Sequence, residues 1–262
     1  MKEMLIRSAT GILFLAIMIG SMLWHPLAFS GVLLLMAAGG IHEAFTLFSR
    51  ITEKFLHPLL SSLLITSTGL FLVSVHTEES IYAYLTLLLI SGYVLWGAIQ
   101  NRRATSMIMY PLFFVAVPVG LLAYFHNQTF YELTALWFFV LVWTNDTFAY
   151  VGGKLFGKKK LASEISPSKT VEGTAIGILM ATVAGMLIAY FNEFSVFTYT
   201  CAGLTVGAFS VLGDLAESKL KRLAKVKDSG NLLPGHGGIL DRFDGALTAV
   251  IPFWVLMYLS NL

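Results

Sequence analysis

The sequence predicts an all-α integral membrane protein, a polytopic bundle of about nine transmembrane helices with a cytoplasmic N-terminus. Three observations support this fold class: a shortage of charged residues, a series of long apolar segments, and a one-sided distribution of lysine and arginine. The 262 residues are 56% hydrophobic and 12% charged. A soluble domain carries about 25% charged residues, so most of this chain is expected to face a bilayer.

Nine apolar segments reach or approach the length of about 20 helical residues that a hydrocarbon core requires. The predicted spans are 8–24, 27–48, 58–76, 80–99, 106–125, 132–152, 171–191, 194–216 and 240–260. The first follows Lys2 and Arg7 as a signal peptide would, but no small-residue cleavage site comes after it, so we interpret it as an uncleaved anchor. The second is interrupted by polar residues, and the roles of His42 and Glu43 within it are left open.

All 17 lysines and arginines fall on one side of the predicted bundle. If every span crosses, the connections on the side of the N-terminus are 1–7, 49–57, 100–105, 153–170 and 217–239, followed by the start of the last helix. These segments contain every basic residue, and the connections on the opposite side contain none. Because positively charged loops stay in the cytoplasm, the sequence predicts a multi-pass cell-membrane protein whose functional site faces the cytoplasm.

No repeat, low-complexity tract or linker divides the chain, so 1–262 is expected to form one polytopic domain. Residues 1–105 offer hydropathy alone and have no predicted role, whereas 106–262 carry the polar motifs. The net charge of +2 is too small to indicate nucleic-acid binding. Glycine pairs at Gly173/Gly177 and Gly203/Gly207 allow close helix approach, and the sequence leaves open whether they also pair two subunits into a homodimer.

The end of the eighth predicted helix carries a charged face. Asp214, Glu217, Ser218 and Lys221 follow the spacing i, i+3, i+4 and i+7, and Arg222 continues a neighbouring stripe. Lysine and arginine at a helix end commonly extend to the membrane interface without further function. The aspartate follows apolar residues at or below headgroup level, where a carboxylate is costly unless it is paired or liganded, so we predict that it is functional.

A glycine-rich segment, KDSGNLLPGHGG at 227–238, leads into the ninth predicted helix. Its glycines suggest a backbone that approaches a ligand closely, as in loops that cradle phosphate, although a turn between two helices also uses glycine and proline. His236 within it is left open as a ligand, a phosphate donor or a packing residue.

Two carboxylates, Asp241 and Asp244, lie three residues apart on the first turn of that last helix. Such a pair can share a divalent ion through oxygen ligands. The alternative is a favourable interaction with the helix dipole, worth about 0.3–1 kcal/mol. Their position beside Arg242 and close to Asp214 favours metal binding.

The sixth predicted span contains Asp146, an ionisable residue inside a membrane helix and therefore a functional candidate. The segment that follows, from Gly152 to Lys159, has the glycine and lysine spacing of a phosphate-binding P-loop. Lys159 replaces the Ser or Thr that should reach Mg²⁺, and the preceding element is a helix instead of a strand, so we reject a P-loop.

The 218–244 segment resembles the phosphatidate cytidylyltransferase (CDP-diglyceride synthase) family. The match runs without departure through Ser218–Arg222, Lys227-Asp228 and 234–244, and the segments 145–150 and 166–173 are similar to two further landmarks of that family. The resemblance implies transfer of CMP from CTP to phosphatidate, giving CDP-diacylglycerol and pyrophosphate in phospholipid biosynthesis. It also implies dependence on Mg²⁺.

The residues and the resemblance together predict three groups of site residues. The expected metal ligands are Asp214, Asp241 and Asp244. The expected catalytic residues are Lys221, Arg222, Lys227, Asp228, His236 and Arg242, and the expected substrate-binding residues are Asp146, Lys169, Ser218, Gly237 and Gly238. Mg²⁺ is the expected metal, with Mn²⁺ as an alternative and one or two cations left open. The expected partners are CTP, phosphatidate and bilayer lipid.

Two other functions compete with this hypothesis. A CTP-using lipid kinase would act on an isoprenoid or phytyl alcohol, would need a base for the hydroxyl nucleophile and would release CDP. A transporter or channel could use Asp146 and Asp214 as a cation path, but the polar groups cluster at one face and do not continue across the membrane. The lipid phosphate is already a nucleophile at neutral pH, so cytidylyl transfer requires no Ser/His/Asp arrangement.

Overall fold

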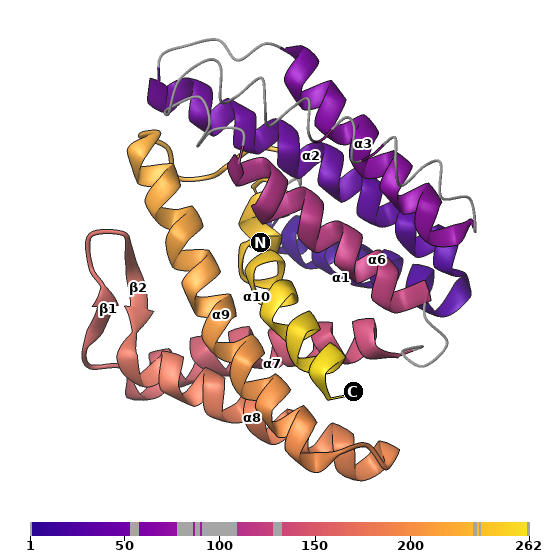
Figure 1. The fold of residues 1–262 in the computed structure, drawn as a ribbon. Coiled ribbons are helices and arrows are strands. Elements are labelled where there is room, and N and C mark those ends of the chain that lie inside the picture. Colours follow the sequence, from indigo (N-terminus) through magenta and orange to yellow (C-terminus); the bar gives the residue numbers. More distant parts are fainter. Residues whose placement is uncertain are drawn as a thin grey trace. The chain divides into compact units, whose positions relative to one another are not determined.

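The computed structural model describes residues 2–52, 58–77, 86, 90, 109–127, 133–232, 235 and 237–260. Within these residues the regular secondary structure is helical apart from one short hairpin (Figure 1). The helices are α1 (Lys2–Trp24), α2 (Pro26–Thr52), α3 (Pro58–His76), the π-helix η1 (Leu112–Ala116), α6 (Val117–Asn127), α7 (Thr134–Phe156), α8 (Val171–Asn192), α9 (Val196–Leu223) and α10 (Leu240–Leu259).

The all-α membrane fold is confirmed for the described residues. The helices that are long and apolar enough to cross a bilayer are Pro26–Thr52, Met109–Asn127, Val171–Asn192, Val196–Leu223 and Leu240–Leu259. Shorter apolar helices run over Thr10–Trp24 and Leu60–His76. Each predicted span within the described residues coincides with a helix, whereas the predicted span 80–99 lies largely outside them. The total of nine spans and the side of the N-terminus stay predictions.

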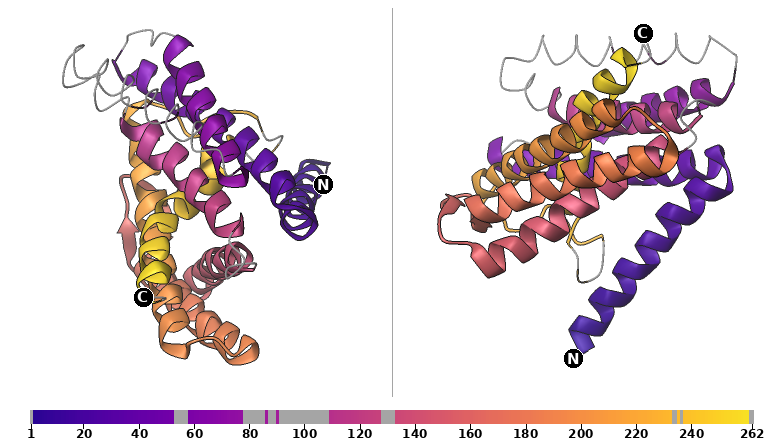
Figure 2. Two further views of the ribbon diagram at one scale, coloured as in Figure 1. Left: turned by 45° about the vertical axis from the view of Figure 1, so that its right-hand side comes forward. Right: turned by 90° about the horizontal axis from the view of Figure 1, so that it is seen from below.

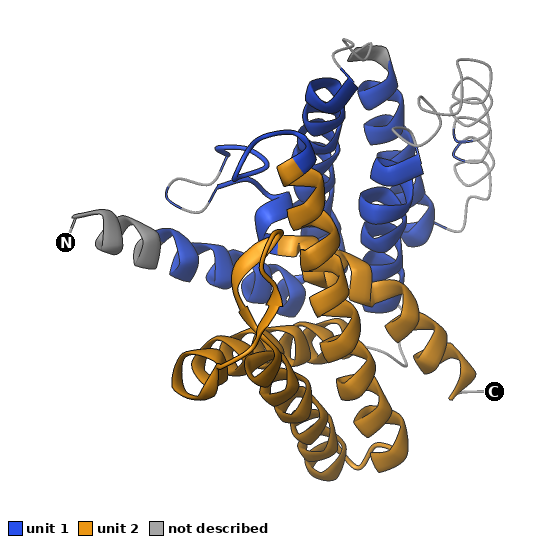
Figure 3. Cartoon of the chain, turned by 90° about the vertical axis from the view of Figure 1, so that its left-hand side faces the viewer, with its two compact units in different colours: residues 1–132, 223–242 blue, residues 133–222, 243–262 orange. Residues whose placement is uncertain are grey.

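The chain divides into two compact units (Figure 3). Unit 1 comprises residues 1–132 and 223–242, and unit 2 comprises residues 133–222 and 243–262. Helix α10 begins in unit 1 and continues in unit 2. The single polytopic domain expected from the sequence over 1–262 stays a prediction.

Unit 1 is organised around α2, which packs against α1, α3, η1 and α6. Its buried core includes Phe29, Leu33 and Ile41. The glycines that interrupt this apolar helix allow the start of α10 to approach it. A Cβ atom added at Gly40 would lie 3.3 Å from Leu240 Cδ2 and 3.2 Å from a methyl carbon of Val115.

Unit 2 contains a closely packed antiparallel pair, α7 and α8, which lie side by side along their length (Figure 2). A Cβ atom at Gly173 would lie 2.6 Å from the carbonyl oxygen of Ala149, and one at Gly177 would lie 2.7 Å from that of Asn145. Gly203 on α9 packs in the same way against the backbone of α8. The glycine pairs thus serve packing within the chain, and the homodimer stays a prediction.

A two-stranded antiparallel hairpin connects α7 to α8 where the sequence predicted only a loop. Its strands are β1 (Lys160–Ala162) and β2 (Ser166–Thr170). Thr170 ends β2 and caps α8, because its hydroxyl accepts a hydrogen bond from the Gly173 N–H at 3.2 Å. Glu172 on the first turn of α8 accepts from the backbone N–H groups of Lys158 at 3.0 Å and Lys159 at 3.1 Å. These bonds fix the hairpin at both ends relative to α7 and α8.

Candidate functional site

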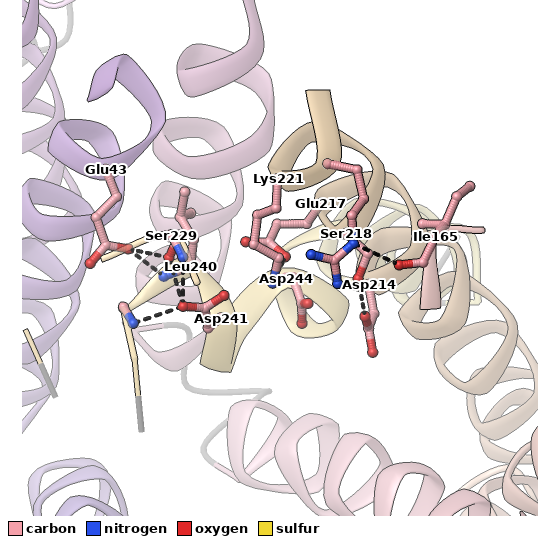
Figure 4. Close-up of polar contacts among 12 residues, drawn as sticks. Glu43, Ile165, Asp214, Glu217, Ser218, Lys221, Ser229, Leu240, Asp241 and Asp244 are labelled. Carbon is pink, nitrogen blue, oxygen red and sulfur yellow. Dashed lines mark hydrogen bonds and ion pairs between the residues drawn. The ribbon is translucent and has the colours of Figure 1, made fainter. Parts of the chain in front are cut away.

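The charged face predicted for the eighth span lies on α9 in unit 2 (Figure 4). Ser218 Oγ donates to Asp214 Oδ1 at 3.2 Å, one helical turn away. One turn further, Lys221 Nζ forms an ion pair with Glu217 Oε2 at 2.5 Å. The Glu217 side chain is fully buried and that of Lys221 is 10% exposed. The face therefore combines an accessible carboxylate with a buried ion pair.

The β-hairpin brings a second lysine to this face. Lys169 on β2 forms an ion pair with Asp214, and the two side chains are 22% and 37% exposed. Nearby, Arg222 Nε donates to the carbonyl oxygen of Ile165 in the hairpin at 3.3 Å (Figure 4). The two contacts hold the hairpin against α9, so Lys169 on β2 lies beside the helix that carries the predicted site residues Asp214 and Arg222.

Asp244 approaches α9 from α10. A Cβ atom at Gly213 would lie 2.5 Å from the carbonyl oxygen of Asp244, so this glycine allows the two helices to pack closely. The Asp244 carboxylate lies near enough to Asp214, Glu217 and Lys221 for their charges to act on it. Its Oδ1 atom also accepts from the N–H of Gly245 at 2.6 Å.

Asp146 on α7 adds a further carboxylate to unit 2. Asn145 Nδ2 donates to its Oδ1 atom at 3.2 Å, and the charges of Asp214 and Lys169 act on it. The buried amide oxygen of Asn145 has no hydrogen-bond partner among the described residues. We define the unit 2 cluster as Asp146, Lys169, Asp214, Glu217, Ser218, Lys221 and Asp244.

The chemistry of the unit 2 cluster fits a hard divalent cation. It gathers four carboxylates but only two lysines, and carboxylate oxygens are the ligands that Mg²⁺ prefers. Among the described residues, no three His, Cys, Asp or Glu side chains converge as a complete ligand set. Mg²⁺ characteristically uses one or two protein carboxylates together with water and substrate phosphates, so Asp214 and Asp244 suit it.

In unit 1, Asp241 is engaged with the glycine-rich segment that precedes it. Its Oδ2 atom accepts from the Ser229 N–H at 2.8 Å and from the Gly238 N–H at 2.8 Å, and the Ser229 hydroxyl, whose single proton it shares with Glu43, lies 3.0 Å away. Gly237 adopts a φ of 87°, and a Cβ atom there would lie 2.7 Å from the same oxygen. The metal role predicted for Asp241 stays a prediction, and one of its oxygens orders this segment.

Glu43 is a candidate that sequence reasoning did not resolve. It is only 3% exposed on α2 and accepts hydrogen bonds from Ser229 Oγ at 2.9 Å, from the Ile239 N–H at 3.0 Å and from the Leu240 N–H at 2.9 Å (Figure 4). The sequence did contain one indication that Glu43 is functional, namely its position, because an ionisable residue inside an apolar span is a functional candidate by default. No periodicity could indicate partners so distant in the chain.

The remaining predicted residues lie in unit 1 or at its boundary. Lys227, Asp228 and Arg242 are exposed around the glycine-rich segment, which also contains Gly237 and Gly238. His236 lies outside the described residues, so its role stays a prediction. The structure thus divides the predicted site residues between the unit 2 cluster with Arg222 and the segment 227–242.

These features define the chain as a polytopic membrane protein in which carboxylates and lysines of α7, α9, α10 and the hairpin act on one another. A family model described as "Cytidylyltransferase family" matches residues 5–260. The chain belongs to the cytidylyltransferase family. The resemblance first seen in 218–244 is therefore confirmed over almost the whole sequence.

The chain is also similar to curated proteins that carry the name phosphatidate cytidylyltransferase. The one from Haemophilus influenzae is 32% identical over 94% of this chain and 95% of its own length. The one from Rickettsia bellii is 32% identical over 71% of this chain and 84% of its own. The one from Bacillus subtilis is 48% identical over 48% of each chain.

Proposed function

We propose that this chain transfers CMP from CTP to phosphatidate, producing CDP-diacylglycerol and pyrophosphate for phospholipid biosynthesis. The observation that carries the proposal is the unit 2 cluster, in which carboxylates suited to a metal lie beside cations suited to phosphate. The name shared by relatives that match most of the chain supports the same reaction.

The reaction requires the protein to bring two anions, CTP and phosphatidate, together. An oxygen of the phosphatidate phosphate forms a bond to the α-phosphorus of CTP, and the bond from that phosphorus to the β-phosphate oxygen breaks as pyrophosphate leaves. The attacking phosphate is already ionised, so no residue has to remove a proton. The main tasks are positioning and the stabilisation of negative charge, as in other phosphoryl transfers.

Asp214 and Asp244 would hold Mg²⁺, and Asp146, on which the charge of Asp214 acts, is proposed to assist. When bound, the metal neutralises phosphate oxygens and stabilises the leaving pyrophosphate. Mn²⁺ would suit the same oxygen ligands, and a second cation is compatible with the surplus of carboxylates.

The two lysines of the cluster serve different purposes. Lys169 pairs with Asp214 near the surface, so its ammonium can exchange that carboxylate for a phosphate of either substrate. Lys221 is held in a buried pair with Glu217 and supplies a fixed positive charge beside Asp244. Arg222, Lys227 and Arg242 are exposed and are proposed to attract the anionic substrates.

The proposed topology has nine spans, a cytoplasmic N-terminus and the functional residues on the cytoplasmic face of the cell membrane. It is supported by the restriction of all 17 basic residues to one set of connections. The arrangement would place the hairpin and the glycine-rich segment on the side where CTP is found.

The direct test is incubation of the purified protein with CTP and phosphatidate in mixed micelles, with and without Mg²⁺. We expect equimolar CDP-diacylglycerol and pyrophosphate only when Mg²⁺ is present. A protein that forms neither product, or that forms both at full rate in the presence of a chelator, would contradict the proposal. Release of CDP with an isoprenoid alcohol as acceptor would favour the lipid kinase.

A further inference from the structure

Glu43 is a buried carboxylate placed where it can control the start of α10. A buried ionised carboxylate is costly unless hydrogen bonds compensate it. On α2 its sequence neighbours Ile41 and Ala44 are buried apolar residues, and its three donors come from the segment 229–240. The contact therefore joins two parts of unit 1 that are far apart in the sequence.

Two of the groups that donate hydrogen bonds to Glu43 lie at the N-terminus of α10. The first N–H groups of a helix have no partner within the helix, and the positive end of the helix dipole lies there. Ile239 precedes α10 and has no side-chain acceptor, so α10 cannot be capped from that position. Glu43 accepts from the N–H groups of Ile239 and Leu240 and thus provides the cap from another helix.

The glycine-rich segment packs closely against the Glu43 carboxylate. A Cβ atom at Gly230 would lie 2.8 Å from Glu43 Cδ, and one at Gly238 would lie 2.6 Å from Glu43 Oε1. A methyl group at Gly230 would require Glu43 to move, and one at Gly238 would require both Glu43 and Ser229 to move. Gly230 and Gly238 are therefore required by the close approach of the segment to Glu43.

Ser229 connects Glu43 to the aspartate on the first turn of α10. Its hydroxyl lies 2.9 Å from Glu43 Oε2 and 3.0 Å from Asp241 Oδ2, while its backbone N–H donates to the same Asp241 oxygen. The Gly238 N–H donates there too. The N–H groups of Ser229 and Gly238 are thus both engaged by the Asp241 carboxylate.

We propose that Glu43 is a positioning residue for cytidylyl transfer, which fixes the first turn of α10 by capping that helix and holding Ser229. That turn carries Asp241 and Asp244. A change in the orientation of the turn would therefore displace two carboxylates that are expected to act in the reaction. The inference rests on the proposed function for its effect on turnover. Its structural part, the protection of the first amides of α10, is independent of any activity.

The test compares Glu43→Gln with wild type and with Glu193→Gln, an exposed control on the short turn after α8. The glutamine has the same shape, but its amide nitrogen cannot accept a hydrogen bond, so in either orientation of the amide at least one of the Ile239 and Leu240 N–H groups loses its acceptor. We expect amide exchange at Ile239 and Leu240 to rise at least about tenfold, while exchange in α8 stays unchanged. In folded protein, kcat should fall about 10–100-fold with KM for CTP within about threefold, as expected when positioning is lost without substrate binding.

Ser229→Ala provides a milder variant, since it removes one bond from the same carboxylate. If Glu43→Gln does not yield folded protein, this variant carries the test, and its kcat must fall with little change in KM. The double variant should lose less than the product of the single losses, because both act through one contact. Wild-type kcat in a folded single variant would overturn the inference. Inactive wild type would instead contradict the proposed function, while amide exchange still tests the cap.

Discussion

Lys169 of the β-hairpin forms an ion pair with Asp214 of α9, and Asp214 also accepts a hydrogen bond from Ser218 one turn later. The hairpin is held there by a second contact, from Arg222 to the carbonyl oxygen of Ile165. Asp214 thus contacts both the long cationic side chain of Lys169 and the hydroxyl of Ser218 on its own helix. The proposed metal ligand and the proposed phosphate ligand are thus in direct contact.

Replacement of Lys169 by methionine should weaken the binding of CTP. The variant keeps the length of the side chain but removes a charge-assisted hydrogen bond, which contributes about 1.5–3 kcal/mol. We expect KM for CTP to rise about tenfold or more in steady-state assays at saturating phosphatidate. Lys160→Met, an exposed position on β1 of the same hairpin, should remain close to wild type. Equal effects of both substitutions would show that only the general charge of the hairpin matters.

Replacement of Asp244 by asparagine should abolish most turnover. The change preserves size but removes a charge from the proposed metal site, and loss of one electrostatic contact at a reacting centre typically costs about 10²–10³ in rate. The measurement is CDP-diacylglycerol formation in detergent at ordinary Mg²⁺ concentration, with Glu164→Gln at the exposed hairpin turn as control. Full turnover by Asp244→Asn would remove this residue from the site.

Gly177→Ala should destabilise the α7–α8 pair. Its methyl group would lie 2.7 Å from the Asn145 carbonyl oxygen and 2.8 Å from Ala149 Cβ, so the helices must separate. Overpacking of this kind costs about 1–3 kcal/mol, which thermal unfolding in detergent detects. Gly31→Ala on α2 is the matched control, because nothing lies within 4 Å of its added Cβ atom. Unfolding of both variants at the same temperature would argue against tight packing at Gly177.

The proposed orientation predicts opposite labelling of two engineered cysteines. In a Cys201→Ser background, Glu193→Cys lies in the turn between α8 and α9, and Lys158→Cys lies in the segment that enters the hairpin. An impermeant maleimide applied to intact spheroplasts should label the first site. The second should react only after the membrane is disrupted. The reverse pattern would invert the proposed topology, and labelling of both from outside would exclude a span over α8.

The helices could be predicted because the length of an apolar segment is visible in the sequence without any knowledge of tertiary contacts. The hairpin was not, because β1 and β2 are short and β2 contains Pro167 between two serines. Its stability comes from contacts at its ends, such as those made by Glu172, which a local pattern does not indicate.

Within the site, contacts along one helix were the most predictable. The i, i+4 spacing of Asp214 and Ser218 predicted a shared face, and the two side chains are hydrogen-bonded. The contacts from Glu43 to Leu240 and from Lys169 to Asp214 depend on the packing of distant segments. For the same reason, the sequence indicated two aspartates on the first turn of α10 but not that Asp241 also orders Ser229 and Gly238.

The most direct test of cytidylyl transfer follows the phosphorus atoms of CTP. The purified wild-type protein is given phosphatidate and CTP labelled either at the α-phosphate or at the γ-phosphate, and the label in the lipid fraction is measured. Transfer of CMP predicts that the α-label enters the lipid while the γ-label is recovered in pyrophosphate. A γ-label in the lipid, or no label from either form, would contradict the proposed function.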